Sequence, residues 1–241
     1  VHAFWWTLAD FCASELLPFV FADAEDDRNQ YTIVVHQVAA RLAADVTATD
    51  ASGAVTIGGT TARTYADLVD LVVDRLQDDN TRSQWAGPAT GVGTINAFIR
   101  RLRSSQRALS SLIRGDLPPS TTREVSTANS QVTVIDMHNL PERAQRFVVG
   151  VTLANETLRK ERAGAGGLLF TMIDELNKYA PREGNSPIKD VLLDIAERGR
   201  YLGLVLSGAQ QFRPQVHRRV VGNSGTTLYG RMDPAELATP G

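Results

Sequence analysis

Two adjacent carboxylates, Asp174 and Glu175, directly follow an apolar run in the segment LLFTMIDELNKYAPRE, residues 168–183. A buried charge is costly unless a partner compensates it, so these acids either reach solvent at a strand end or face a cation. In metal-assisted hydrolysis, the aspartate would hold Mg²⁺ through a water, and the glutamate would polarise the water that attacks a phosphate. The pattern is that of a Walker B motif, although a solvated strand end explains the pair equally well when it is taken alone.

Further polar residues follow in the segment ERGRYLGLVLSGAQQFRP, residues 197–214. Gln210 and Gln211 end its apolar strand, where a polar side chain can contact the γ-phosphate and the attacking water, as a sensor residue does. Arg198 and Arg200 precede the strand, and an arginine at a domain edge can stabilise transition-state charge on a neighbouring subunit's nucleotide. The simpler alternatives are that the arginines complement the dipole of a helix C-terminus and that the glutamines belong to a polar loop.

The elements that must position these residues are predicted in residues 131–241, where apolar strands alternate with helices. This alternation indicates a parallel sheet covered by helices on both faces, with ligands at the carboxyl ends of its strands. Asp136 and Ser207 are expected beside Asp174 and Glu175 at that edge. The predicted strands are residues 131–136, 168–174, 201–207 and 226–232, and the predicted helices are residues 141–162 and 187–199.

Residues 1–128 are predicted to form a mostly helical subdomain ahead of the α/β part in residues 129–241. The boundary is placed within residues 116–130, DLPPSTTREVSTANS, because two prolines and many hydroxyls are typical of a linker. Apolar residues recur every three or four positions in the predicted helices, as in an amphipathic helix. These helices cover residues 26–46, 64–77 and 92–114, and residues 52–63 form a turn-rich connector with at most a short hairpin.

Arg100, Arg103 and Arg107 fall on one face of the helix predicted at residues 92–114, away from its apolar stripe. Such a face could contact the phosphates of DNA, and binding would then weaken steeply with salt. The alternative interpretation is a solvated face, or arginines paired with the many acids of residues 1–80.

The charge of the whole chain is nearly balanced, at −2 over 241 residues, so bulk charge does not make it a polyanion binder. The single cysteine, Cys12, excludes an internal disulfide and suits a reducing, cytoplasmic setting. The apolar stretch near the start is interrupted by Asp10 and Glu15 and lacks a basic flank. The sequence therefore predicts neither a signal peptide nor a membrane span.

Four successive segments between residues 130 and 238 together resemble the HerA-like hexameric ATPases, which are relatives of the FtsK DNA pumps. Their common order makes the resemblance more specific than any single motif. The segments are VTVIDMHNLPERAQRFVVGVTLANETLRKER, LLFTMIDELNKYAP, DIAERGRYLGLVLSGAQQFRPQVHRRVVGNS and TTLYGRMDPAEL. Residues 1–128 are similar in position and helical character to the helical insertion that this family carries inside its RecA-like core.

The resemblance implies a RecA-like fold, in which helices flank a parallel sheet, and a homo-oligomeric ring that is a hexamer in the family. It implies hydrolysis of ATP with Mg²⁺ and translocation of double-stranded DNA through the pore of the ring. Such rings work with a nuclease or another effector protein in DNA-end processing or in antiviral defence.

The resemblance also implies a role for each candidate residue. Asp174 would be the acid that binds Mg²⁺, and Glu175 would be the catalytic acid that polarises water. Arg200 would be the arginine finger that reaches the neighbouring subunit, with Arg198 as its substitute. Gln210 or Gln211 would be the sensor.

One part of the family's pattern is missing from these residues. The P-loop, G-x-x-x-x-G-K-[ST], does not occur, and the glycine-rich residues 87–94, GPATGVGT, lack the lysine. The three lysines, Lys160, Lys178 and Lys189, are expected on helix or loop surfaces. Because the P-loop precedes the helical insertion in the family, the expectation is that this chain is the C-terminal part of a longer subunit. It would then bind ATP poorly by itself, since the P-loop cradles the phosphates.

Two other functions remain open at this point. The main alternative is a non-catalytic ring scaffold that assembles and activates a partner effector enzyme. The other is an unrelated α/β hydrolase or nuclease that binds metal directly through Asp136, Asp174 and Glu175, although no histidine or further acid stands at a suitable spacing.

Overall fold

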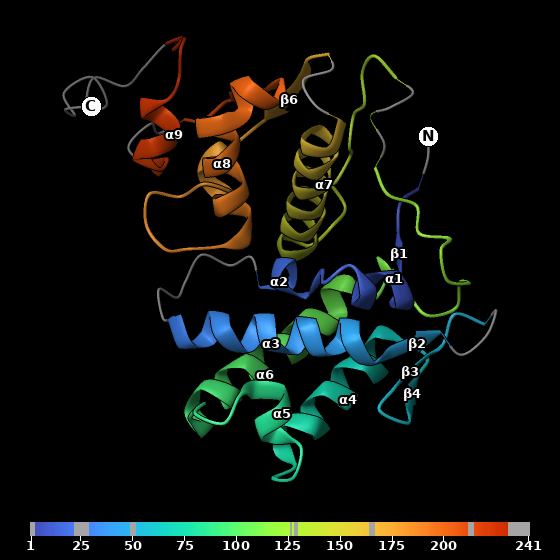
Figure 1. The fold of residues 1–241 in the computed structure, drawn as a ribbon. Helices are drawn as coiled ribbons and strands as arrows, with labels where there is room; N and C mark the ends of the chain where they lie inside the picture. Colours follow the sequence, from blue (N-terminus) through green and yellow to red (C-terminus); the bar gives the residue numbers. More distant parts are fainter. Residues whose placement is uncertain are drawn as a thin grey trace. The chain divides into compact units, whose positions relative to one another are not determined.

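The structure is a computed structural model that describes residues 3–21, 29–48, 52–125, 127, 130–163, 167–211 and 215–230. Within these ranges the chain is a mixed α/β protein, with helices, small parallel sheets and a small antiparallel sheet (Figure 1). The described chain divides into two compact units. The first unit ends at Val148 and the second continues from Val149, so the boundary falls inside a long helix. The predicted domain boundary at residues 128 and 129 stays a prediction.

Helices dominate the first unit (Figure 1). α3 packs on α5 and α6, and α4 packs on the same two helices. The helices predicted at residues 26–46 and 64–77 are confirmed as α3 and α4, while residues 26–28 lie outside the described residues. The bounds are α1 Leu8–Ala13, α2 Leu17–Val20, α3 Asn29–Asp45, α4 Tyr65–Gln77, α5 Arg82–Ala86 and α6 Val92–Leu109.

The helix predicted at residues 92–114 is shorter than expected. α6 ends at Leu109, and β5, Ile113–Arg114, then pairs in parallel with β1, Trp6–Thr7. The apolar periodicity continues through Ile113, but that side chain is buried as part of a strand instead of a helix. A long-range strand pairing of this kind leaves no signal in local periodicity.

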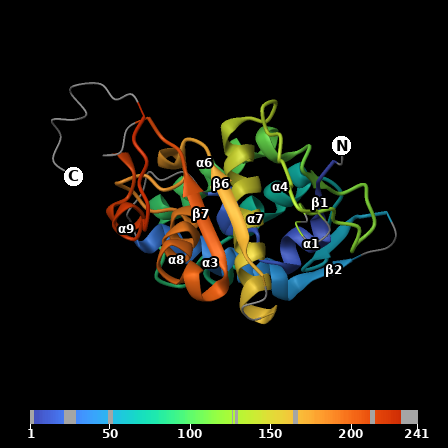
Figure 2. The same ribbon diagram turned by 90° about the horizontal axis from the view of Figure 1, so that it is seen from above.

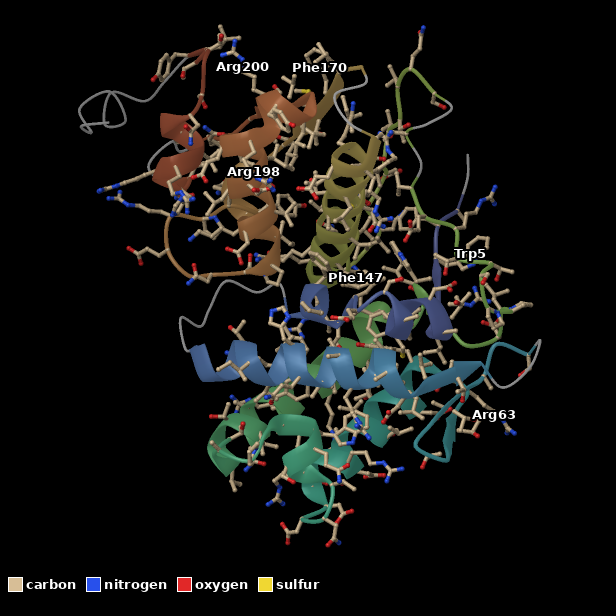
Figure 3. The ribbon with its side chains drawn as sticks, in the orientation of Figure 1. Trp5, Arg63, Phe147, Phe170, Arg198 and Arg200 are labelled. Atoms are coloured by element: carbon tan, nitrogen blue, oxygen red, sulfur yellow. The ribbon has the colours of Figure 1, made fainter. Side chains whose placement is uncertain are left out.

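Aromatic side chains form the centre of the first unit. Trp6 meets Phe147 edge to face, with ring centroids 5.1 Å apart, and Phe11 lies 6.2 Å from the same ring; Phe147 is labelled in Figure 3. Phe21 stacks on Phe98 at 4.9 Å. Such pairs add about 0.5–1.5 kcal/mol each beyond the apolar area that they bury. These contacts join the start of the chain to α6 and to the beginning of α7, Glu142–Ala163.

The predicted hairpin at residues 52–63 is confirmed. β3, Val55–Ile57, and β4, Thr60–Ala62, are antiparallel, and β2, Val46–Ala48, adds a third strand. The two-residue loop consists of Gly58 and Gly59, both with positive φ, as a tight hairpin turn requires. The sheet leads directly into α4, which begins with a capping box between Thr64 and Asp67.

Cys12 lies on α1 and is almost fully buried, and burial raises the pKa of its thiol to about 12. Because the thiolate is the reactive form, we expect a thiol reagent at pH 8 to leave Cys12 unmodified in the native protein and to label it quickly in denaturant. Timed labelling followed by mass spectrometry measures this difference. Native labelling as fast as that of the denatured chain would show that α1 does not shield the thiol.

The second unit is built around one parallel strand pair. β6, Leu169–Ile173, and β7, Leu204–Gly208, run side by side and are joined through α8, Pro187–Leu202, which packs on β7 (Figure 2). The strands predicted at residues 168–174 and 201–207 are thereby confirmed, with β7 starting three residues late. The unit also contains the second half of α7, a 3₁₀ turn at Leu176–Lys178 and α9, Arg218–Gly222.

α8 begins as predicted but ends later. Ser186 caps its first turn by accepting a hydrogen bond from Lys189 N at 3.2 Å. The helix does not stop at Gly199; it continues to Leu202, and Gly203 ends it in the left-handed conformation. A Cβ at Gly199 would lie 2.7 Å from the Leu204 carbonyl oxygen. The glycine at position 199 therefore permits close packing of α8 on β7 and does not terminate the helix.

The larger parallel sheet that the sequence predicts is not formed by the described residues. Residues 131–136 form no strand, and neither do residues 226–230, while residues 231 and 232 lie outside the described part of the chain. Val132 and Val134 are 78% and 84% exposed, so the alternating valines have no surface to cover. Alternation predicts a strand only where a neighbouring strand supplies the hydrogen bonds.

β6 is also less buried than its apolar run indicates. Phe170 and Met172 on one face are 69% and 78% exposed, whereas Ile173 is buried. The expectation of a fully buried strand was therefore wrong, because only one face of the strand pair is covered. Among the described helices, none is long and apolar enough to cross a bilayer.

Two of the three lysines are buried, contrary to expectation. Lys160 donates from Nζ to the Gly167 carbonyl oxygen at 2.7 Å, and Lys189 donates from Nζ to the carbonyl oxygen of Gly184. A buried ammonium must be hydrogen-bonded to be tolerated. Each of these lysines therefore links its helix to a loop of the second unit through a hydrogen bond to a backbone carbonyl.

Candidate functional site

The carboxyl ends of β6 and β7 lie next to each other. In the parallel register Ile173 stands opposite Gly208, and the hydrogen bonding continues beyond the strands. Ala209 N donates to Ile173 O at 2.9 Å, and Leu176 N donates to Ala209 O at 3.0 Å. The residues that follow the two strands therefore share one edge of the sheet, which is the edge where parallel sheets bind ligands.

Asp174 and Glu175 stand at this edge with different local structure. Asp174 is exposed, and its Oδ1 accepts a hydrogen bond from Glu175 N at 2.9 Å. Glu175 adopts the left-handed conformation, with φ 52° and ψ 50°, which costs a residue with a Cβ roughly 1–2 kcal/mol. Strain of this kind persists only where the surrounding structure imposes it, and it is frequent at functional sites. Glu15 and Ser120 adopt a positive φ as well, so the conformation of Glu175 supports a functional site only together with its neighbours.

The Glu175 carboxylate is paired with Lys178, whose Nζ contacts its Oε2. Both side chains are 45% exposed, so the ion pair is a partly solvated one. Oε1 of Glu175 has no hydrogen-bond partner among the described residues, and it is the oxygen that can orient a water. Sequence reasoning placed Lys178 on the surface and missed the pair, although a separation of three residues within a turn was the available signal.

Gln210 and Gln211 follow β7 at the same edge. The Oε1 atom of Gln210 is buried and lacks a hydrogen-bond partner within the described residues. Leaving such an acceptor unsatisfied costs about 1–3 kcal/mol, so a donor that arrives with a ligand would be favoured there. Gln211 is exposed. Of the two candidate sensor residues, Gln210 is the one with a buried side-chain oxygen that no described residue satisfies.

Arg198 and Arg200, both on the last turns of α8, have different surroundings (Figure 3). Arg198 Nη2 donates to Asp194 Oδ2 at 2.6 Å and to Glu161 Oε1 at 3.0 Å. The hydrogen bonds to Asp194 and then to Glu161 raise the pKa of the Arg198 guanidinium above its ordinary value. Arg200 is exposed and forms no ion pair with any described residue. Arg200 is thus the arginine that can reach a second molecule.

The remaining candidates belong to the first unit. Asp136 accepts a hydrogen bond from His138 N at 3.0 Å in a turn, and the strand that was expected to carry Asp136 to the sheet edge is not formed. Arg100, Arg103 and Arg107 lie on the exposed face of α6, as predicted.

The donor atoms at the sheet edge suit a hard cation bound together with phosphates. They are carboxylate and amide oxygens, which Mg²⁺ prefers, and Mg²⁺ commonly takes one or two protein carboxylates while phosphates and waters complete its shell. The described residues contain no cluster of three or more acids, histidines or cysteines that would hold a metal by itself. Asp174 therefore suits an Mg²⁺ ion that is already bound to phosphates, whereas the described residues do not form a metal centre of their own.

No protein-family model matches this chain, and no curated protein matches it in sequence. The likeness to the HerA-like ATPases therefore stays a prediction from the four sequence segments.

Proposed function

We propose that this chain is part of a ring-forming, ATP-dependent DNA translocase of the HerA-like type, with a RecA-like core, and that hydrolysis takes place at the Asp174–Glu175 strand end. One observation carries the proposal: the two carboxylates after β6 share an edge with Gln210 after β7, and the Glu175 backbone is strained there. A site that positions a water needs hydrogen-bond acceptors on both sides of it. The Glu175 carboxylate is one acceptor, and the unsatisfied amide oxygen of Gln210 on the neighbouring strand end is the other.

Each side chain has a distinct task in this proposal. Asp174 would hold the Mg²⁺ of the nucleotide, and that ion would offset the charge of the phosphates. Oε1 of Glu175 accepts a hydrogen bond from the attacking water, orients it and takes its proton as the water oxygen bonds to the γ-phosphorus. The bond between that phosphorus and the bridging oxygen breaks, and ADP leaves with the electron pair on this oxygen. Gln210 Oε1 accepts the second hydrogen bond of that water, which satisfies the buried oxygen.

The ring supplies what these residues lack. Arg200, exposed and without an ion pair to a described residue, acts as the finger on the neighbouring subunit's phosphates, while Arg198 is held by two carboxylates. The phosphate cradle comes from outside these 241 residues, because no P-loop motif occurs in them. Double-stranded DNA and a nuclease or another effector are the partners of the ring.

A non-catalytic scaffold that assembles and activates an effector enzyme is the second candidate. Two observations favour it: the missing P-loop motif, and the ion pair with Lys178 that occupies one oxygen of Glu175. A carboxylate oxygen that contacts an ammonium is less available to the attacking water.

ATP turnover by the full-length protein, with and without duplex DNA, tests the proposal. A translocase hydrolyses ATP with Mg²⁺, and we expect saturating duplex DNA to raise the rate at least fivefold. A scaffold assembles and binds its effector, but DNA leaves its slow turnover unchanged. DNA cleavage that needs Mg²⁺ but no ATP would reject both candidates in favour of a nuclease.

A further inference from the structure

α6 is a positively charged helix. Its 18 residues, Val92–Leu109, include four arginines and no aspartate or glutamate. One side of the helix is buried through Ile95, Phe98 and Leu102. The opposite side exposes Arg100, Arg103 and Arg107, and we call these three residues the α6 arginine face.

Arginines on several other helices are paired with an acid one turn away, whereas the three residues of the α6 arginine face have no such pair among the described residues. No residue of the α6 arginine face forms an ion pair or a hydrogen bond with any residue that the structure describes, although the chain has a net charge of −2. The pairs on other helices are Arg41 with Asp45, Arg146 with Glu142, Arg159 with Glu156 and Arg198 with Asp194.

A further guanidinium is fixed beside this face. Arg143, in the first turns of α7, donates from Nη1 to the Arg101 carbonyl oxygen at 3.0 Å and to Ser104 Oγ at 2.9 Å. Ser104 is exposed and neighbours Arg100 and Arg107 on the helix surface, at separations of four and three residues. Positive charge is thus collected on one helix surface, and part of it is held rigidly by hydrogen bonds.

The side chains of the α6 arginine face favour a double-stranded nucleic acid over a single-stranded one. Arginine binds phosphate oxygens with two parallel hydrogen bonds, and serine hydroxyls and amide side chains are common phosphate contacts. Single-stranded nucleic acids are held largely by stacking on exposed aromatic rings. The only aromatic residue of α6 is Phe98, which is fully buried. The face therefore fits a backbone whose bases are already stacked.

The α6 arginine face is long enough to reach more than one phosphate. At 1.5 Å per residue, Arg100 and Arg107 are separated by roughly 10 Å along the helix axis.

We propose that the α6 arginine face binds the phosphate backbone of a double-stranded nucleic acid without reading its sequence. The inference deepens the proposed function. It rests on that function for one point, namely that the duplex is double-stranded DNA. The physical argument itself requires only regularly spaced phosphates.

The test measures binding of a 30-base-pair duplex DNA to the full-length protein by fluorescence anisotropy, without nucleotide, over a range of salt concentrations. The test variant combines Arg100→Gln, Arg103→Gln and Arg107→Gln, which preserves helix propensity. The control variant combines Arg82→Gln, Arg114→Gln and Arg219→Gln, which removes the same charge from arginines whose partner acids are 86%, 62% and 35% exposed. Ion pairs of this kind contribute little to stability, and the three arginines of the test variant are exposed, so both variants should fold.

We expect the test variant to lose at least tenfold in affinity, and the slope of log K against log salt to become less steep by about 2.7, since each phosphate contact contributes about 0.9. The control variant should keep the slope. Equal losses in both variants would overturn the proposal, because bulk charge alone would then explain binding. Equal binding of a polyglutamate probe would overturn it in favour of an acidic protein partner. Because no nucleotide is present, failure of the ATPase proposal would leave this result unaffected.

Discussion

Glu175→Gln is expected to reduce ATP turnover by the full-length protein at least 100-fold while nucleotide binding is retained. Glutamine has the size of glutamate but cannot take the proton of the attacking water. Loss of a general base typically costs two to four orders of magnitude in rate, and 100-fold corresponds to about 2.7 kcal/mol of transition-state stabilisation. Single-turnover hydrolysis measures the chemical step, and equilibrium binding of a fluorescent ATP analogue measures the retained affinity.

The fold should tolerate this substitution. It removes the ion pair with Lys178, but both side chains are 45% exposed, and a pair of that kind contributes at most about 1 kcal/mol. Glu183→Gln is the matched control, because Glu183 is an exposed acid in the following loop. We expect the control to hydrolyse ATP at the normal rate. Normal turnover by Glu175→Gln would remove Glu175 from the mechanism.

The elements that the sequence predicted best are those whose signals are local. α4 combines an apolar period with a capping box from Thr64 to Asp67, and both are properties of one short segment. The β3–β4 hairpin is specified by Gly58 and Gly59, which can take positive φ without strain. Neither element needs a distant partner to explain its bounds.

The errors lie where structure depends on residues that are distant in the sequence. Ile113 fits the apolar period of α6, but it forms a strand with Trp6, more than 100 residues away. Gly199 looks like a helix end, but a glycine is needed there because the carbonyl oxygen of Leu204 on the neighbouring strand leaves no room for a Cβ. Residues 131–136 have the alternation of a strand but no partner strand within the described residues. Local sequence patterns contain none of this information.

The candidate site shows the same division. The apolar run before Asp174 and Glu175 correctly predicted a strand, and the parallel register with β7 brought Gln210 to the same edge. The strained backbone of Glu175 and its ion pair with Lys178 were not predicted, because they depend on the geometry of one turn. Residue identity and spacing correctly placed Asp174, Glu175 and Gln210 at one edge but wrongly placed Asp136 there, and the ion pair of Glu175 could be seen only in the structure.

Gly115→Ala is expected to destabilise the first unit by about 3 kcal/mol or more. Gly115 is buried directly after β5, and a Cβ there would lie 2.0 Å from the Arg63 carbonyl oxygen and 2.6 Å from Leu8 Cδ1. The Leu8 side chain can move, but the Arg63 carbonyl belongs to the backbone between β4 and α4. Overfilling a packed site usually costs 1–3 kcal/mol, and a clash with backbone lies at the upper end of this range or beyond it.

Urea denaturation measures this loss, and the rate of Cys12 labelling under native conditions reports the opening of the same unit. A loss of 3 kcal/mol should raise the labelling rate more than 100-fold, since each 1.36 kcal/mol changes the open population tenfold. Gly93→Ala is the control, because nothing lies within 4 Å of its added Cβ and its position in the first turn of α6 favours alanine by up to about 1 kcal/mol. If Gly115→Ala matched Gly93→Ala in stability and labelling rate, the prediction would be wrong. The backbone at Arg63 would then move aside, and the close approach of Gly115 to it would not constrain the fold.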